Sequence, residues 1–372
     1  MSSSRYCQVY PQNVKSAGYT EYDQIDFVLS GAGQKLVANT VTLCADVVVS
    51  GTTVATQVYI NNLVGGHGFI SSIAVSTVNQ GQLEYIAEYN RLVSAVSNAS
   101  LNSSLDTFNS NLTCELRTCD PHVSGALLYG LFSKDQVDEP LFKTNPDMSL
   151  KLHCCLNNVI GDPLLPFAKT GDVTVTLQLE RVINALYGYP TIGAGISYTL
   201  QNVRLNYITT PDDGVYSKNY TFNVYSSIRQ SIQSSYSNVT TKAPVVANSV
   251  FCTFIQQANE SNPMTDNLLQ EYLPLVSSVQ FLWNGNFSQS VVYTLDNVQD
   301  ILQNYLEAIS GSVTVNNASL QCLAQNKSYG VGLKFNQPVN LAQNSFTLNL
   351  TSAIDGSSPY TINMFFNGVL NI

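Results

Sequence analysis

Alternating apolar and polar residues are the feature of this sequence that most restricts its fold. From Val173 to Leu179, in VTVTLQL, valine or leucine occupies every second position. A period of two places these side chains on one face of an extended strand, which predicts an antiparallel strand buried on that face. Residues 196–210 alternate in the same way, and a change of phase at Gln201–Asn202 predicts a β-bulge.

Similar runs of β-branched and aromatic residues, separated by Gly, Asn, Asp, Pro and Ser, extend along the chain and predict an all-β protein. They lie at residues 35–60, 219–228, 243–257, 275–283, 328–335, 345–350 and 359–372. A length of 372 residues allows one large unit or two smaller ones. The turn sequence PDDG at Pro211–Gly214, after which the strand pattern starts afresh, predicts two domains.

Each half also contains an amphipathic helical pattern, with apolar residues at steps of three and four. The pattern of the first half comprises Leu83, Ile86, Tyr89, Leu92, Val93 and Val96. That of the second comprises Leu295, Val298, Ile301, Leu302, Tyr305, Leu306 and Ile309, with Asp296 and Gln299 at capping-box spacing and Gly311 as the stop. Strands joined by long loops that carry helices are typical of jelly rolls, so we expect two tandem jelly-roll β-sandwiches. Residues 97–120 form one such loop, which we expect to make contacts.

The composition argues against several partners. Only 11% of residues are charged, the net charge is −9, and no Lys/Arg run occurs, so we expect no direct sequence-specific binding of nucleic acid. No stretch approaches the roughly 18 apolar residues of a transmembrane helix. The first residues, MSSSRYCQVYPQNV, lack the apolar stretch of a signal peptide, so we expect synthesis in the cytosol. A surface of neutral polar side chains suits a protein that packs against copies of itself.

The cysteines and sequons are open to two interpretations. Without a secretory signal, reduced and buried thiols are favoured over disulfides. The cysteines lie at positions 7, 44, 114, 119, 154, 155, 252 and 322, and a zinc site of Cys114, Cys119, His122 and His153 is possible only on paper. Asn-x-Ser/Thr sequons occur at Asn98, Asn102, Asn111, Asn219, Asn238, Asn259, Asn286, Asn317, Asn326 and Asn349, and chance in an Asn/Ser/Thr-rich chain is favoured over glycosylation.

No catalytic, cofactor-binding or metal-binding motif emerges, so we expect no enzyme and no cofactor. The glycines of GGHG (residues 65–68) are followed neither by the Lys of a phosphate-binding loop nor directly by a helix. We expect them to be turn residues, and Gly81 to separate a strand from the helix. His67, His122 and His153 lie in no catalytic signature. The carboxylate pairs Asp138–Glu139 and Asp212–Asp213 lie in turn-like segments, where solvated side chains are the default.

Residues 65–93 resemble a recurring block of the double jelly-roll major capsid proteins of eukaryotic DNA viruses, of the virophage, polinton-like and nucleocytoplasmic large DNA virus types. The matching pieces are GGHGFISSIAVS, then Gly81, Leu83 and Glu84, then EYNRL with Tyr89 and Arg91. DPLLPF (residues 162–167) and the two strands after it look like the end of the first jelly roll in that family. The resemblance covers roughly residues 20–210 at the level of motifs.

The resemblance implies a structural protein of the virion. Homotrimers would form pseudo-hexagonal capsomers that tile an icosahedral shell with neighbouring capsomers and minor or penton capsid proteins. The implied parts are an N-terminal arm (1–19), a first jelly roll (20–210), a linker turn (211–214) and a second jelly roll (215–372). The arm either reaches a neighbouring capsomer or is a disordered tail. The amphipathic helix of the first half is expected to cover the sandwich with Ile86, Tyr89 and Val93. It is expected to leave Glu88 and Arg91 exposed or between subunits.

Two alternatives remain open. A minor or vertex capsid protein belongs to the same class, and a single jelly roll would favour it. A secreted carbohydrate-binding or adhesive β-sandwich belongs to a different class, and the sequons and the neutral polar surface favour it.

Overall fold

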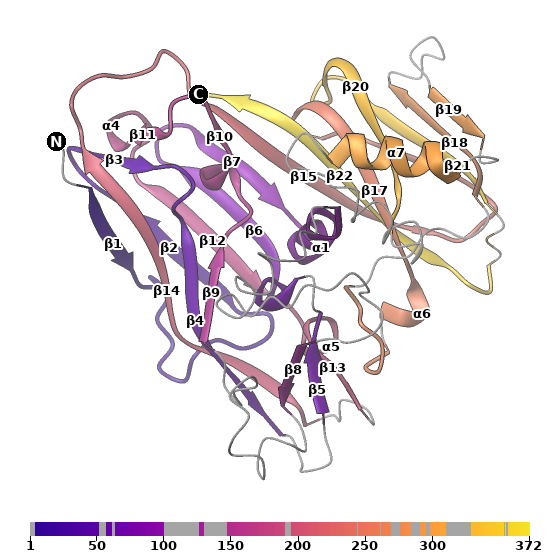
Figure 1. The fold of residues 1–372 in the computed structure, drawn as a ribbon, viewed down its shortest axis with the longest axis horizontal. Coiled ribbons are helices and arrows are strands. Elements are labelled where there is room, and N and C mark those ends of the chain that lie inside the picture. Colours follow the sequence, from indigo (N-terminus) through magenta and orange to yellow (C-terminus); the bar gives the residue numbers. More distant parts are fainter. Residues whose placement is uncertain are drawn as a thin grey trace.

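The structure is a computed structural model. It describes the chain from residue 4 to residue 372, except for residues 52–56, 62–63, 100–125, 130–146, 190–194, 244, 261, 269–275, 284–290, 295–297, 310–328, 353 and 355. Two β-sandwiches lie side by side in it, with helix α1 (Tyr89–Ala99) between them (Figure 1).

The first sandwich is built from two sheets that face each other. One sheet has the order β2-β12-β6-β7, and the other has the order β11-β3-β14-β4-β9, with β1 paired to β14. Along the chain, β2, β4, β6, β9, β12 and β14 alternate between the two sheets, as successive strands of a jelly roll do. The strands are β1 (Arg5–Val9), β2 (Gln24–Leu29), β3 (Gln34–Val37), β4 (Thr42–Ser50), β6 (Ile70–Thr77), β7 (Gly81–Ile86), β9 (Asp147–Lys151), β10 (Val159–Ile160), β11 (Leu164–Pro166), β12 (Val173–Leu179) and β14 (Ser197–Pro211).

The second sandwich is a complete jelly roll in its strand order. Its sheets have the orders β15-β22-β17-β20 and β16-β21-β18-β19. Each strand therefore lies in the opposite sheet to the one before it, except where β18 and β19 form a hairpin, and the first and last strands are neighbours. The strands are β15 (Thr221–Ile232), β16 (Tyr236–Thr241), β17 (Val246–Gln256), β18 (Val276–Trp283), β19 (Val291–Thr294), β20 (Val331–Asn340), β21 (Phe346–Ser352) and β22 (Tyr360–Asn371).

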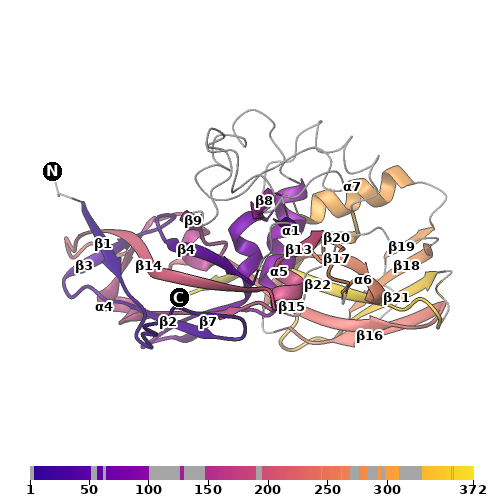
Figure 2. The ribbon, with the colours of Figure 1, turned by 90° about the horizontal axis from the view of Figure 1, so that it is seen from below.

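The sandwiches are joined through their sheets as well as through the chain. Strand β7 of the first pairs in parallel with β15 of the second at Tyr85 and Ser226, so one sheet continues from β2 to β20. Helix α7 (Val298–Ile309) covers β17 and β20 (Figure 2). The smaller elements are η1 (Gly65–Phe69), η2 (Cys155–Asn157), α4 (Phe167–Thr170), α5 (Val182–Ala185), α6 (Gln257–Glu260) and the sheet of β5 (Gln57–Ile60), β8 (Ala126–Tyr129) and β13 (Tyr187–Tyr189).

The alternating patterns produce the predicted strands. Strand β12 is Val173–Leu179, and its valines and leucines are buried while the residues between them are partly exposed. Strand β14 covers the second pattern, and its pairing with β4 shifts between Gln201 and Arg204, which confirms the bulge. Asn202 takes a positive φ of 51° there, a conformation that asparagine tolerates better than most residues.

The prediction for the start of the first helix was wrong. Residues Gly81–Ile86 form strand β7, antiparallel to β6, and the helix begins only at Tyr89. Gly81, with φ of +75°, lies in the turn between these two strands and not between a strand and the helix. Leu83 and Ile86 are buried in both interpretations, so their spacing did not separate a strand from a helix. GGHGF, whose glycines were expected to be turn residues, forms a buried 3-10 helix in which Gly65 has a positive φ of 53°.

The N-terminal segment packs on the first sandwich within the described residues. Arg5–Val9 pairs with β14 as an edge strand, and Tyr19 is buried against the same strand. The predicted contact loop 97–120 lies almost wholly outside the described residues, as do Asp296 and Gly311 of the second helical pattern.

Candidate functional site: the junction between the jelly rolls

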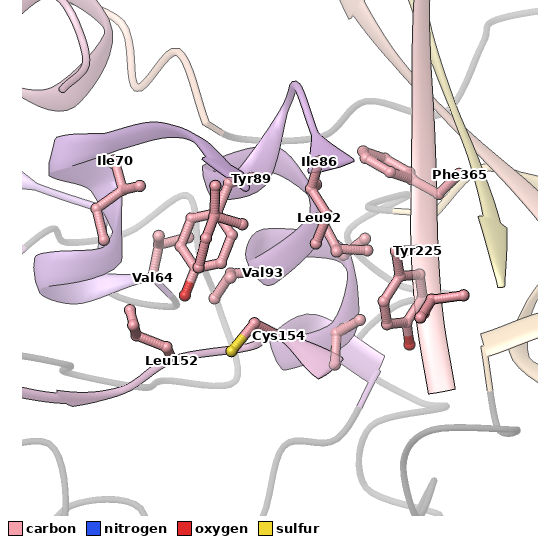
Figure 3. Packing of buried hydrophobic residues seen from close by; sticks show 14 of the residues in the cluster. Val64, Ile70, Ile86, Tyr89, Leu92, Val93, Leu152, Cys154, Tyr225 and Phe365 are labelled. Atoms are coloured by element: carbon pink, nitrogen blue, oxygen red, sulfur yellow. The ribbon is translucent and has the colours of Figure 1, made fainter. Parts of the chain in front are cut away.

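The segment that carried the family resemblance, residues 65–93, lies where the two sandwiches meet. Its apolar side chains are part of one continuous core with residues of the second sandwich. Figure 3 shows Ile86 and Leu92 in the same cluster as Tyr225 of β15 and Phe365 of β22. Burial of these side chains supplies the nonpolar part of the junction.

Backbone hydrogen bonds to side chains join the two sandwiches beside this core. The carboxylate of Glu84 accepts hydrogen bonds from the backbone N–H of Tyr225 in β15 (2.7 Å) and of Cys155 in η2 (2.6 Å). In the reverse direction, Ser227 Oγ of β15 accepts from the backbone N–H groups of Ala87 (2.8 Å) and Glu88 (3.3 Å). The two bonds to Ser227 satisfy backbone N–H groups just before α1. A helix that begins in a buried position needs such partners for its first N–H groups.

Four charged side chains of the junction, Glu88, Arg91, Arg229 and Glu260, form a compact cluster. Arg91 of α1 lies 3.3 Å from both Glu88 and Glu260, measured between nitrogen and oxygen. Arg229 of β15 lies 2.8 Å from Glu260 and 3.6 Å from Glu88. Among the described residues of this cluster, two arginines and two glutamates therefore alternate. Only 5% of the Arg91 side chain is exposed, against 40% of Arg229, so Arg91 is the buried centre of the cluster.

The prediction for Glu88 and Arg91 was wrong. They were expected on an exposed or intersubunit side of the helix, but they lie within one chain between its two jelly rolls. Their partners Arg229 and Glu260 come from the second half of the sequence, and the local helical pattern contains no information about them. A charged residue on the polar face of a helix is normally solvated, which is why the sequence favoured exposure.

Further polar side chains of α1 reach groups on both sides. Arg91 Nη1 donates to the carbonyl of Asn267 (2.8 Å), and Ser94 Oγ donates to the carbonyl of Leu268 (2.8 Å). On the other side, Asn90 Nδ2 donates to Glu180 at the end of β12 (2.9 Å). Helix α1 therefore has partners on its polar face as well as on its apolar face.

Burial changes the proton affinity of Glu84. Removal from water raises the pKa of its carboxyl to about 7, and the hydrogen bonds from Tyr225 and Cys155 oppose this rise. Burial also raises the pKa of Glu88, and the positive charges of Arg91 and Arg229 offset part of this rise. In the part of the chain that the structure describes, no cation lies beside Glu84 as Arg91 and Arg229 do beside Glu88, and the Glu84 carboxyl binds a proton near neutral pH.

His67, His153 and Tyr89 form a second buried group beside α1. His67 Nδ1 lies 2.9 Å from the hydroxyl of Tyr89, which also accepts from the backbone N–H of His153 (3.1 Å). The rings of His67 and His153 pack edge to face, with centroids 5.3 Å apart. Of the zinc site considered from the sequence, Cys114, Cys119 and His122 lie outside the described residues. In the described ranges, no group of three or more His, Cys, Asp or Glu is arranged to hold a metal ion.

The remaining candidate residues are the carboxylate pairs and the cysteines, and those that the structure describes contact structural groups of the fold. Asp213 and Asp212 lie 2.6 Å and 3.9 Å from the buried Lys35 Nζ, so the PDDG turn is tied to β3. Cys7, Cys44, Cys154, Cys155 and Cys252 are free thiols. Burial raises the pKa of Cys154 to about 12, so that thiol is protonated and unreactive at neutral pH. Asp138–Glu139, Cys114, Cys119 and Cys322 fall outside the described residues.

Two jelly rolls in one chain, sharing a sheet and a buried junction, define a double jelly-roll protein. No protein-family model and no curated protein matches the sequence. The fold is similar to the Faustovirus major capsid protein, with a TM-score of 0.68 at 10% identity over 100% of this chain and 90% of that one. For the cryo-EM structure of the Sputnik virophage, the TM-score is 0.56 at 12% identity over 100% and 86% of the two chains.

The mavirus major capsid protein is similar as well, with a TM-score of 0.51 at 10% identity over 98% of this chain and 88% of that one. The similarity extends over both halves of the chain, including the second half, in which no motif was identified. This chain therefore has the double jelly-roll fold of these capsid proteins. Within its described part, no helix is long and apolar enough to cross a membrane.

Proposed function

We propose that the protein is a viral major capsid protein that acts through assembly. The observation that carries the proposal is the similarity of the whole fold, over both sandwiches, to capsid proteins of Faustovirus and mavirus. Three copies would form a homotrimeric capsomer. Because each chain supplies two jelly rolls, the trimer would present six of them and a pseudo-hexagonal outline that tiles an icosahedral shell.

The junction supports this role physically. Six jelly rolls make an even outline only if the two in each chain keep a fixed relative orientation. The shared sheet, the Glu84 hydrogen bonds and the Arg91 cluster hold them by three kinds of interaction. Buried ion pairs add little net stability, but they favour one geometry, because a displaced partner leaves a buried charge unpaired.

The division of the chain follows from the same proposal. Residues 20–210 would form the first jelly roll, 211–214 the linker turn and 215–372 the second. Residues 1–19 would act as the arm, and the pairing of Arg5–Val9 with β14 places its strand at a sheet edge, where a neighbouring capsomer can add to it. The virion would be the site of function, with synthesis in the host cytosol, and neighbouring capsomers and minor or penton capsid proteins would be the partners.

A structural role without catalysis is part of the proposal. The four charged side chains of the junction cluster pair with one another, and burial keeps Cys154 protonated. Of the alternatives, a minor or vertex protein would be favoured by a single jelly roll, whereas this chain has two. A secreted adhesive sandwich would require glycans at the sequons and oxidised cysteines.

Size-exclusion chromatography with light scattering tests the proposal. A mass of about three times the 40.5 kDa chain mass, constant over a hundred-fold range of protein concentration, is expected. A strictly monomeric species at every concentration would contradict it. Mass spectrometry of material from infected cells separates the secreted alternative, which predicts N-glycans and disulfides.

A further inference from the structure

A groove of about 460 Å³ opens on the second jelly roll, away from the junction. It forms where β20 bulges from its partner β17: Ala247 lies opposite Val339 and Ser249 opposite Lys334, so residues 335–338 have no matching partners. Phe335 points inward, with its ring 5.3 Å from that of Trp283, while residues 336–338 are exposed. Bulges of this kind re-aim side chains and are frequent beside binding sites.

The lining combines one aromatic ring with side-chain amides. Trp283, at the end of β18, is partly exposed and meets Phe335 at an interplanar angle of 68°. The two rings meet edge to face, and the partly exposed Trp283 lines the groove beside Phe335. Asn336, Gln337, Asn340 and Asn344 line the groove beside it. Among the described residues of the lining, Lys334 is the charged one and none carries a carboxylate.

The amide groups are positioned but have spare hydrogen-bonding capacity. Asn340 Oδ1 accepts from the backbone N–H of Ala342 (3.1 Å), which fixes the side chain, and its Nδ2 donates to no protein group that the structure describes. The side chains of Asn336, Gln337 and Asn344 likewise make no hydrogen bond to other described groups. Each amide offers both a donor and an acceptor.

We infer that this groove binds a neutral saccharide. The C–H face of a pyranose ring packs on the electron-rich face of an indole, and neighbouring hydroxyls match the paired donor and acceptor of an amide. The groove volume lies within the range of small-ligand sites, roughly 300–1,000 Å³. A single exposed lysine is screened by salt, so the amides and not the charge would determine the preference. This activity is separate from assembly and does not depend on it.

Tryptophan fluorescence gives a direct test, because the chain has one tryptophan and its emission reports on this groove. The full chain is produced in bacteria, without glycans, and titrated with lactose, maltose, cellobiose and N,N′-diacetylchitobiose to 100 mM. A saturable change in emission with at least one sugar is expected. The variant N336A/Q337A should weaken that binding about five-fold or more, since each lost hydrogen bond reduces affinity by roughly two- to ten-fold. The exposed Gln230→Ala on β15 is the matched control and should bind like the wild type.

Isothermal titration calorimetry of Trp283→Phe and Trp283→Ala provides a readout without the fluorophore, with weaker binding in Ala than in Phe. Unaltered circular dichroism and oligomeric mass show that the variants fold. The absence of a saturable change with all four sugars would overturn the inference, as would equal binding by wild type and N336A/Q337A. The same fluorescence titration of protein produced in eukaryotic cells separates two sources of the sugar. If the added sugars no longer change the emission, the groove holds a glycan of the protein itself. If they still change it, the groove binds a glycan of another molecule.

Discussion

The helices α1 and α7 have similar apolar patterns in the sequence but different positions in the molecule. Helix α7 covers the sheet of β17 and β20 with Ile301, Tyr305 and Ala308, and its polar residues Gln303 and Glu307 face solvent. Helix α1 buries its apolar side and also its polar residues, among them Arg91 and Ser94. The difference shows that a polar helix face can be an internal surface when a second sandwich packs against it.

The largest loss of stability is expected at Arg91, the buried charged residue of α1, because the polar face of α7 has no buried counterpart in the described residues. Arg91→Met leaves Arg229 as the one arginine beside Glu88 and Glu260 in the described part of the chain, and removal of one partner of a buried ion pair costs about 3–5 kcal/mol. Urea denaturation measures this loss. Arg229→Met, which removes the more exposed arginine from the same glutamates, is the matched control and should cost clearly less. Equal losses for both variants would show that burial of Arg91 does not govern the cluster.

A pH-dependent effect is expected from Glu84. Its folded-state pKa of about 7 exceeds the unfolded value, so between about pH 4.5 and pH 7 the folded state holds a proton that the unfolded state has released. The free energy of unfolding should therefore decrease as pH rises through this range and level off above it, by about 1–3 kcal/mol in total.

The variant Glu84→Gln removes this contribution, and the difference in stability between wild type and variant should change with pH over that range. The exposed Gln230→Ala on β15 removes no titratable group, so it is the control and should give a difference that does not vary with pH. A constant difference for Glu84→Gln would show that Glu84 remains ionised throughout.

The close approach of α7 to its sheet predicts an intermediate effect. A Cβ at Gly332 of β20 would lie 2.9 Å from Cβ of Ala308 and 3.1 Å from Cα of Tyr305, so Gly332→Ala must displace the helix. Overpacking of this kind costs about 1–3 kcal/mol. Gly195→Ala is the control, since no atom of a described residue beyond its chain neighbours lies within 4 Å of its added Cβ. Thermal unfolding of both variants gives the comparison, and an unchanged melting temperature for Gly332→Ala would contradict the packing of α7.

The smallest effects compare single hydroxyl and amide groups on the two helices. Ser94→Ala on α1 leaves the buried carbonyl of Leu268 without its donor and should cost about 1–2 kcal/mol. Gln303→Ala on α7 removes an exposed hydrogen bond to Glu307 and should change stability by less than about 0.5 kcal/mol. Equal effects in denaturant titrations would remove the distinction between an internal and an external polar face.

The sequence predicted what depends on local periodicity. The strand Val173–Leu179, the bulge at Gln201–Asn202 and the double jelly-roll fold were confirmed, because one buried face imposes a period of two on each strand. The junction was not predicted, because Glu84, Glu88 and Arg91 acquire partners from β15 and α6, more than 100 residues away. An arginine and two glutamates within eight residues of a largely uncharged sequence were the available signal.

The central claim is that three copies of this double jelly roll form a capsomer, and electron microscopy of the purified protein tests it most directly. Two-dimensional class averages should show particles with three-fold symmetry and a pseudo-hexagonal outline, in which each chain supplies two neighbouring lobes. Particles with a single pair of lobes, or assemblies without three-fold symmetry, would contradict the claim.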